Sequence, residues 1–243
     1  MIVILGAAAA AGPVIAAAPA AKKLLVVSVT KGFRHESIPP AERVIEAIGK
    51  ESGAYTVDFA RTDEELLAKT TPAALEGFDG VFFANTTGDL PLGDRQGFLD
   101  WITKGHAFMG MHSATDTFHG FPPFIAMIGA EFDYHKAQVK VEPKVEDARS
   151  AATRGIAPGF AVLDEIYIMK SFDKARVHPL LSLDKHPNTG EPGYFPLAWT
   201  REEGKGRVFY TAFGHREDVL EADWYKQHLL GGIRWALRLD GGR

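Results

Sequence analysis

Side chains that could do chemistry follow a short apolar run in the middle of the chain. The run Ala107–Met111 predicts a buried strand, and it is followed directly by a histidine, a hydroxyl and a carboxylate: His112, Ser113 and Asp116. In open α/β sheets ligands bind at the carboxyl ends of the strands, where a strand-to-helix elbow often carries a Cys or Ser nucleophile. Here the elbow position is His112, and the chain contains no cysteine. Cysteine nucleophile chemistry is therefore excluded.

A second histidine is predicted to reach the same place. A strand predicted over Arg207–Phe213 leads through Gly214 to His215. If this strand lies beside the one that ends at His112, the two imidazoles face each other across a cleft. Such a pair can share a metal ion or divide the roles of general acid and general base. The alternative is a turn in which His215 only caps the following segment.

Histidines and carboxylates form a larger candidate set along the chain. We expect the catalytic residues to be His112, His215, Glu165 and Asp116, and the metal ligands to be His112, His119, His135 and His215. Neutral imidazole and carboxylate suit Zn²⁺ or a similar divalent ion, and the same groups transfer protons near neutral pH. Their spacing matches no dedicated zinc motif. Each histidine, taken alone, could equally be a core residue with satisfied nitrogens.

Polar turns after other predicted strands are candidates for binding a substrate. The expected substrate-binding residues are Arg34, His35, Asn85, Ser113 and Tyr167. Tyr167, Phe118 and Phe121 are also the aromatic residues expected to stack on a sugar face. The glycine fingerprint of dinucleotide sites and the phosphate-binding loop of nucleotide hydrolases are absent. We therefore expect neither a nicotinamide nor a flavin cofactor.

The elements that position these residues alternate between strand and helix. In the first half, strands are predicted over Leu24–Thr30, Tyr55–Ala60, Gly80–Ala84 and Ala107–Met111, and helices over Pro39–Lys50, Asp63–Lys69 and Leu92–Lys104. This order predicts an α/β fold with a doubly wound, mostly parallel sheet flanked by helices, like that of flavodoxin. Antiparallel additions are expected in the second half, with strands over Ala137–Lys144, Glu165–Met169, Phe195–Thr200 and Arg207–Phe213 and a closing helix over Asp223–Leu239.

Composition and the first residues bear on partners and location. A net charge of −4 and a pI near 6.1 argue against a nucleic-acid partner, because a general nucleic-acid binder would show a basic face. Residues 1–20 are uncharged and rich in alanine, with small residues before Lys22, and this pattern predicts a signal peptide cleaved near Ala20. We expect a periplasmic or secreted protein with no stable membrane span once the signal is removed. No long linker interrupts residues 21–243, which are predicted to form one α/β domain.

Six segments, taken in order, resemble the ThuA-like (trehalose utilisation) family: Gly32–His35, Asn85–Gly88, Gly110–Asp116, Ile128–Phe132 with His135, Asp164–Tyr167 and Gly206–His215. The resemblance implies a fold like that of class I glutamine amidotransferases. That superfamily has its catalytic Cys at the position of His112 and its catalytic His near His215. The resemblance thus implies the architecture but not glutamine hydrolysis. Family members look like sugar-utilisation proteins, often found with oxidoreductases that act on disaccharides.

Three functions are compatible with these residues. The first is an enzyme that acts on an oxidised (keto) glycoside or disaccharide by histidine and carboxylate acid–base chemistry, with metal assistance, as an isomerase, an epimerase or a glycoside-cleaving enzyme. A sugar oxidoreductase would then supply the substrate. The second is a metal-dependent hydrolase of another substrate. The third is a non-catalytic periplasmic sugar-binding module.

Overall fold

The central element is a large sheet whose first five strands are parallel. The computed structural model describes residues 21–240. The sheet has eight strands in the order β2-β1-β3-β4-β12-β11-β10-β7, and the pairs from β2 to β12 are parallel while the rest are antiparallel. The parallel strands are β2 (Tyr55–Ala60), β1 (Lys22–Val27), β3 (Gly80–Ala84), β4 (Ala107–Met111) and β12 (Gly206–Thr211). The predicted fold class, including the antiparallel additions, is confirmed.

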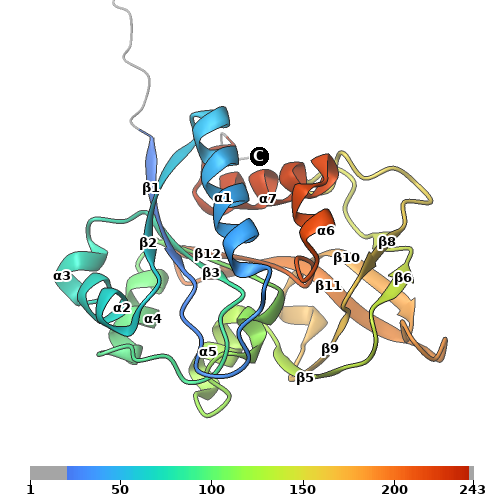
Figure 1. Cartoon of the computed structure of the whole chain (residues 1–243), viewed down its shortest axis with the longest axis horizontal. Helices are drawn as coiled ribbons and strands as arrows, with labels where there is room; N and C mark the ends of the chain where they lie inside the picture. The colour runs from blue at the N-terminus through green and yellow to red at the C-terminus, as the bar shows by residue number, and fades with distance from the viewer. Residues whose placement is uncertain (1–20, 241–243) are drawn as a thin grey trace, which may run out of the picture.

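Helices cover both faces of this sheet (Figure 1). On one face α1 (Ile38–Ser52) packs against α6 (Glu217–Glu221) and α7 (Asp223–Ala236). On the other side lie α2 (Asp63–Lys69), α3 (Pro72–Leu75), α4 (Arg95–Thr103) and α5 (Pro122–Ile128). Because both faces are covered, β3 and β4 are buried along their whole length, which explains their continuous apolar sequence.

The antiparallel half differs in detail from the prediction. The strands that extend the sheet are β11 (Pro192–Glu203), β10 (His178–Lys185) and β7 (Lys144–Val145). Two small sheets lie beside it, β5 (Glu131–His135) with β9 (Tyr167–Lys170), and β6 (Val139–Val141) with β8 (Val162–Asp164). The single strand predicted over Ala137–Lys144 was therefore wrong. The strand predicted to begin at Glu165 begins at Tyr167, and β10 was not predicted.

Two sequence predictions concern the first residues and membranes. The predicted signal peptide, residues 1–20, lies outside the described residues. Within residues 21–240, no helix is both long and apolar enough to cross a membrane.

Candidate functional site

The site forms where three neighbouring parallel strands end. His112 follows β4, Asn85 follows β3, and Gly214 leads from β12 to His215. His112 and Asn85 have positive φ angles of 45° and 53°, so the backbone turns sharply at both positions. His112 begins the short 3₁₀ helix η1 (His112–Asp116). The elbow predicted from the sequence is thus present, with a histidine at the turn.

The side chain of His112 is fully buried and fixed in one orientation. Its Nδ1 lies 3.1 Å from the carbonyl oxygen of Ala212, and Tyr210 donates a hydrogen bond of 2.6 Å to the carbonyl of His112. A bond to a carbonyl requires a proton on Nδ1. In the neutral imidazole, Nε2 therefore carries a lone pair, and this nitrogen points toward Glu165 and His215.

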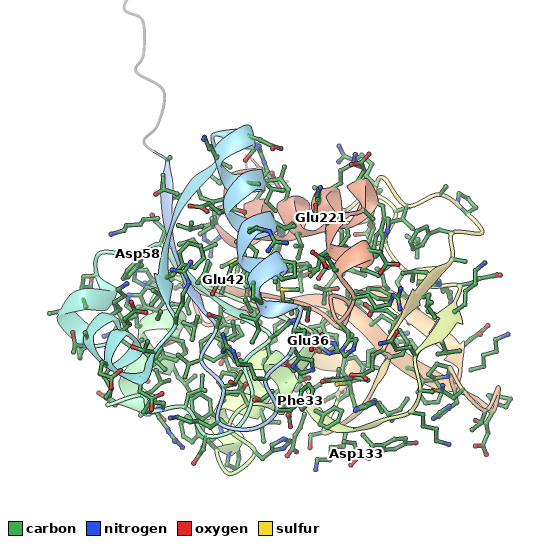
Figure 2. The ribbon with its side chains drawn as sticks, viewed as in Figure 1. Phe33, Glu36, Glu42, Asp58, Asp133 and Glu221 are labelled. Carbon is green, nitrogen blue, oxygen red and sulfur yellow. The ribbon has the colours of Figure 1, made fainter. Side chains whose placement is uncertain are left out.

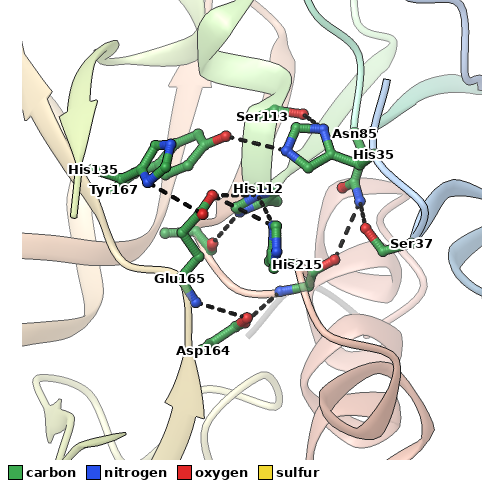
Figure 3. Close-up of polar contacts among 12 residues, drawn as sticks. His35, Ser37, Asn85, His112, Ser113, His135, Asp164, Glu165, Tyr167 and His215 are labelled. Carbon is green, nitrogen blue, oxygen red and sulfur yellow. Dashed lines mark hydrogen bonds and ion pairs between the residues drawn. The ribbon is translucent and has the colours of Figure 1, made fainter. Parts of the chain in front are cut away.

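Glu165 lies at the centre of the site and touches three imidazoles (Figure 3). Its Oε2 is 3.6 Å from His112 Nε2 and 3.4 Å from His215 Nδ1. Its Oε1 is 3.2 Å from His135 Nδ1. The two histidines also approach each other, with 3.3 Å between His112 Nε2 and His215 Nδ1. The expected meeting of His112 and His215 thus takes place around a carboxylate.

His35 completes the group from the loop between β1 and α1. Its ring nitrogens lie 3.4 Å from the Ser113 hydroxyl and 3.5 Å from the Tyr167 hydroxyl. One ligand atom from each of His35, His112, Glu165 and His215 lies within 4.8 Å of the other three. The sequence predicted a substrate-binding role for His35, whereas the structure places it among the candidate metal ligands.

Burial keeps these imidazoles neutral. It lowers the pKa of His35 to about 4, with help from the neighbouring His215 and His135. It also lowers the pKa of His112 well below the ordinary value, again with help from adjacent histidines. The pKa of His215 is lowered by burial too, although the charge of Glu165 opposes the shift. Neutral imidazoles are the form that binds metal ions.

A buried carboxylate that was not among the predicted site residues holds the His215 loop. Asp164 accepts hydrogen bonds of 2.9 Å from the backbone nitrogens of Gly214 and Glu165. Burial raises the pKa of Asp164 to about 7. Asn85, fully buried, donates to the Gly214 carbonyl at 3.2 Å and to Ser37 at 2.8 Å. Asp164 and Asn85 therefore both hold the loop that carries His215. No spacing pattern in the sequence identifies Asp164 as a site residue.

A pocket of about 650 Å³ opens beside the cluster. Arg34 and His215 are among the residues that line it, so the pocket reaches the cluster through His215, whose side chain is 22% exposed. Phe33 and Glu36 also line it, and they lie in the loop below α1 (Figure 2). The expected placement of Arg34 beside the site agrees with this geometry.

The remaining predicted residues lie elsewhere or in other roles. His119 bridges Asp116 and Glu131, with 2.6 Å to each carboxylate, in a partly exposed network that does not include His112. Burial acts to lower the pKa of His119, but its two carboxylate partners raise it above the ordinary value. Tyr167 is buried, with its ring centroid 4.3 Å from that of His112. Phe118 is buried too, which leaves no free face on either ring for a sugar.

The comparisons with known proteins agree with this architecture. A family model described as ThuA, trehalose utilisation, matches residues 23–236. This chain belongs to the ThuA family. No curated protein matches the sequence.

Solved structures of ThuA-like proteins share the fold. One from Bacteroides uniformis has a TM-score of 0.73 at 19% identity, and the match covers 93% of this chain and 95% of that one. Another, from Parabacteroides merdae, has a TM-score of 0.72 at 18% identity over 89% and 90% of the two chains. A β-galactosidase from Bacillus circulans sp. alkalophilus matches 91% of this chain with 31% of its own length, at 12% identity and a TM-score of 0.55. At these identities the likeness concerns the fold alone.

The donor atoms in this ThuA-family chain fit a divalent metal ion. Ligand atoms about 2.1 Å from a tetrahedral metal lie roughly 3.4 Å from one another. The three separations among His112 Nε2, His215 Nδ1 and Glu165 Oε2 are 3.3, 3.4 and 3.6 Å. The lone pair on His112 Nε2 faces the Glu165 carboxylate, and a cation between these two acceptor atoms would stabilise the arrangement. Two histidines and a glutamate also leave further positions open, as in catalytic metal sites.

Proposed function

We propose that this ThuA-family chain is a metal-assisted enzyme that acts on keto-glycosides. The observation that carries the proposal is the buried cluster of three imidazoles and a carboxylate at the strand ends, with a pocket beside it. The family connects the chain with carbohydrates, and the cluster provides both a metal site and acid–base groups. A pure binding module does not need several desolvated imidazoles around one carboxylate, because such groups cost stability and add little to sugar recognition.

In this proposal His112, His215 and Glu165 hold the metal, and His35 is the fourth residue of the group. The bond between His112 Nδ1 and the Ala212 carbonyl fixes the ring for this role, as outer partners of metal-binding histidines commonly do. A divalent ion there would supply Lewis acidity that polarises the ketone oxygen of the substrate.

Proton transfer then falls to His135, which lies just outside the four-residue group. Its Nδ1 contacts Glu165 Oε1 at 3.2 Å and the Lys136 carbonyl at 3.1 Å, and its side chain is 42% exposed. With the proton on Nδ1, Nε2 is available to accept a proton from the substrate.

The reaction begins at the carbon next to the ketone. His135 removes a proton from that carbon, and the electron pair forms an enolate. When the enolate collapses, the glycosidic oxygen on the adjacent carbon leaves with its bonding electrons and takes up a proton from the protonated His135, which returns to its neutral form. The products are an unsaturated keto-sugar and the released alcohol, so atoms and charge balance. We further propose that the substrate comes from a sugar oxidoreductase and that the protein acts in the periplasm or outside the cell.

Elemental analysis joined to a turnover assay tests the proposal. The protein from Ala21 onward is dialysed against buffer with Zn²⁺ or Mn²⁺, desalted, and analysed for metal beside the His112→Ala/His215→Ala double variant. His178→Ala is the matched control, because His178 pairs with Asp147 on the surface. We expect about one equivalent of metal in the wild type and control and none in the double variant, provided that thermal unfolding shows all three to be folded.

Turnover is measured with 3-keto-trehalose by detection of released glucose. His135→Gln is expected to keep the metal and to lose at least a hundredfold in kcat, as removal of a general base does. A wild type that binds no metal overturns the metal site. A metal-loaded wild type that is inactive on a panel of keto-disaccharides overturns the enzymatic proposal.

A further inference from the structure

Phe33, one of the residues that line the pocket, has an aromatic ring that is largely exposed to solvent. Phe33 is 67% exposed, the highest value among the large hydrophobic residues of the described chain. It lines the pocket, and its ring lies edge-on to that of His35, with 4.8 Å between centroids. Phe33 therefore contacts the histidine cluster through His35 and also lines the pocket beside that cluster.

The backbone around Phe33 is held firmly although the ring is exposed. Thr87 donates from its hydroxyl to the Phe33 carbonyl at 2.9 Å and accepts a bond from the Gly32 nitrogen at 3.2 Å. The carbonyl of Thr87 also accepts from the Lys31 nitrogen at 2.8 Å. The loop thus holds the backbone of Phe33 in place, so a ligand would not have to order the loop on binding.

Polar groups joined by hydrogen bonds also line the pocket. Arg216 makes two bonds to Asp218, of 2.8 and 3.0 Å, and a third of 2.8 Å to Gln138 Oε1. The Oε1 bond orients the Gln138 amide, whose NH₂ group can donate further bonds. A pocket lined by both an apolar ring and oriented donors and acceptors suits a sugar ring, which has an apolar face and a rim of hydroxyls.

The charges on the pocket wall favour a neutral ligand. Its lining includes two arginines, Arg34 and Arg216, and three carboxylates, Glu36, Glu217 and Asp218. Arg216 is neutralised by Asp218, and Glu217 pairs with Arg43 at 3.1 Å. No excess of positive charge remains for a phosphate. Pockets of about 300–1,000 Å³ hold ligands of drug size, so a pocket of 650 Å³ is large enough to hold a second sugar ring beside the ring that reacts at the histidine cluster.

We propose that this pocket is the subsite for the leaving group of a keto-glycoside, with Phe33 as its stacking platform and Gln138 as a hydrogen-bonding residue. This inference rests on the proposed function and narrows it: the substrate carries an uncharged sugar as its leaving group. The oxidised ring lies at the histidine cluster, and the leaving sugar lies over Phe33.

The test compares two substrates that differ only in the leaving group. We measure kcat/KM for 3-keto-trehalose and for methyl 3-keto-α-glucoside with the metal-loaded wild type, Phe33→Ala, Phe33→Tyr and Gln138→Ala. The ratio of kcat/KM for 3-keto-trehalose to kcat/KM for methyl 3-keto-α-glucoside is expected to fall at least tenfold in Phe33→Ala and to fall in Gln138→Ala. The same ratio is expected to be retained in Phe33→Tyr. Tyr194→Ala is the control, because Tyr194 is an exposed aromatic outside the pocket lining.

The outcomes separate the two proposals. If both substrates turn over but Phe33→Ala leaves the ratio unchanged, the subsite is overturned while the proposed function stands. If the wild type turns over neither substrate, the proposed function fails. Calorimetric titration with trehalose then decides the subsite: weaker binding to Phe33→Ala than to the wild type supports it, and equal or absent binding refutes it.

Discussion

Gly214 is the residue on which the geometry of His215 most directly depends, and its replacement by alanine gives a sharp prediction. Its φ angle is +115°, a backbone conformation that residues with a Cβ rarely adopt. A Cβ there would lie 2.4 Å from Met111 Cε and 2.7 Å from the Tyr225 hydroxyl oxygen. Tyr225 cannot yield easily, because it is fully buried and donates to the Phe213 carbonyl at 2.7 Å.

Two costs add up in Gly214→Ala. Backbone strain of this kind costs about 1–3 kcal/mol, and overpacking in a dense interior costs about 1–3 kcal/mol more. We expect the free energy of unfolding to fall by about 2–6 kcal/mol, measured by urea denaturation. The backbone must also shift, so the bond from the Gly214 nitrogen to Asp164 lengthens and His215 moves away from Glu165. Metal content and keto-sugar turnover are expected to fall with it.

Gly190→Ala is the matched control. Gly190 also has a positive φ, +74°, but nothing lies within 4 Å of its added Cβ. It has a positive φ as Gly214 does but lacks the steric cost, so the difference between the two variants measures the packing around Gly214 together with the extra strain of its larger φ. If both variants unfold at the same urea concentration and retain full turnover, the argument that tight packing positions His215 is refuted.

Two further predictions concern groups buried in the same half of the chain. Burial lowers the pKa of His228 to about 4 from an ordinary 6.5, so its contribution to stability is complete above pH 6.5 and is lost as the pH falls toward 4. In His228→Asn the amide can still donate to the Ala152 carbonyl, but it does not titrate. The loss of unfolding free energy between pH 7.5 and 5.0 should therefore be about 2 kcal/mol smaller in the variant than in the wild type. Urea titrations that show the same loss in both proteins contradict this. Asp164→Asn keeps one oxygen for one of the two backbone donors, Gly214 and Glu165, and places an NH₂ group against the other, so we expect about a 10–100-fold loss of metal affinity in competition with a chelator. Unchanged affinity would show that Asp164 does not position the site.

The parallel half of the fold could be predicted closely from the sequence. The strands Tyr55–Ala60, Gly80–Ala84 and Ala107–Met111 have the predicted bounds, and the last two are continuous buried runs. A parallel strand covered on both faces must be apolar at nearly every position, so its sequence marks it without knowledge of its neighbours. The antiparallel half lacks this signal, because its strands are short and partly exposed and pair with segments far away in the sequence.

The sequence by itself determined which chemistry is excluded and where the first reactive residue lies. The absence of cysteine and the position of His112 after a buried strand follow from local sequence alone. Only the tertiary structure decided which groups surround His112. His119 is seven residues away along the chain yet pairs with Asp116 and Glu131, because η1 carries that segment toward β5. His215 arrives from the loop after β12, since the carboxyl ends of parallel strands converge at one edge of the sheet, and Glu165 arrives from the segment between β8 and β9.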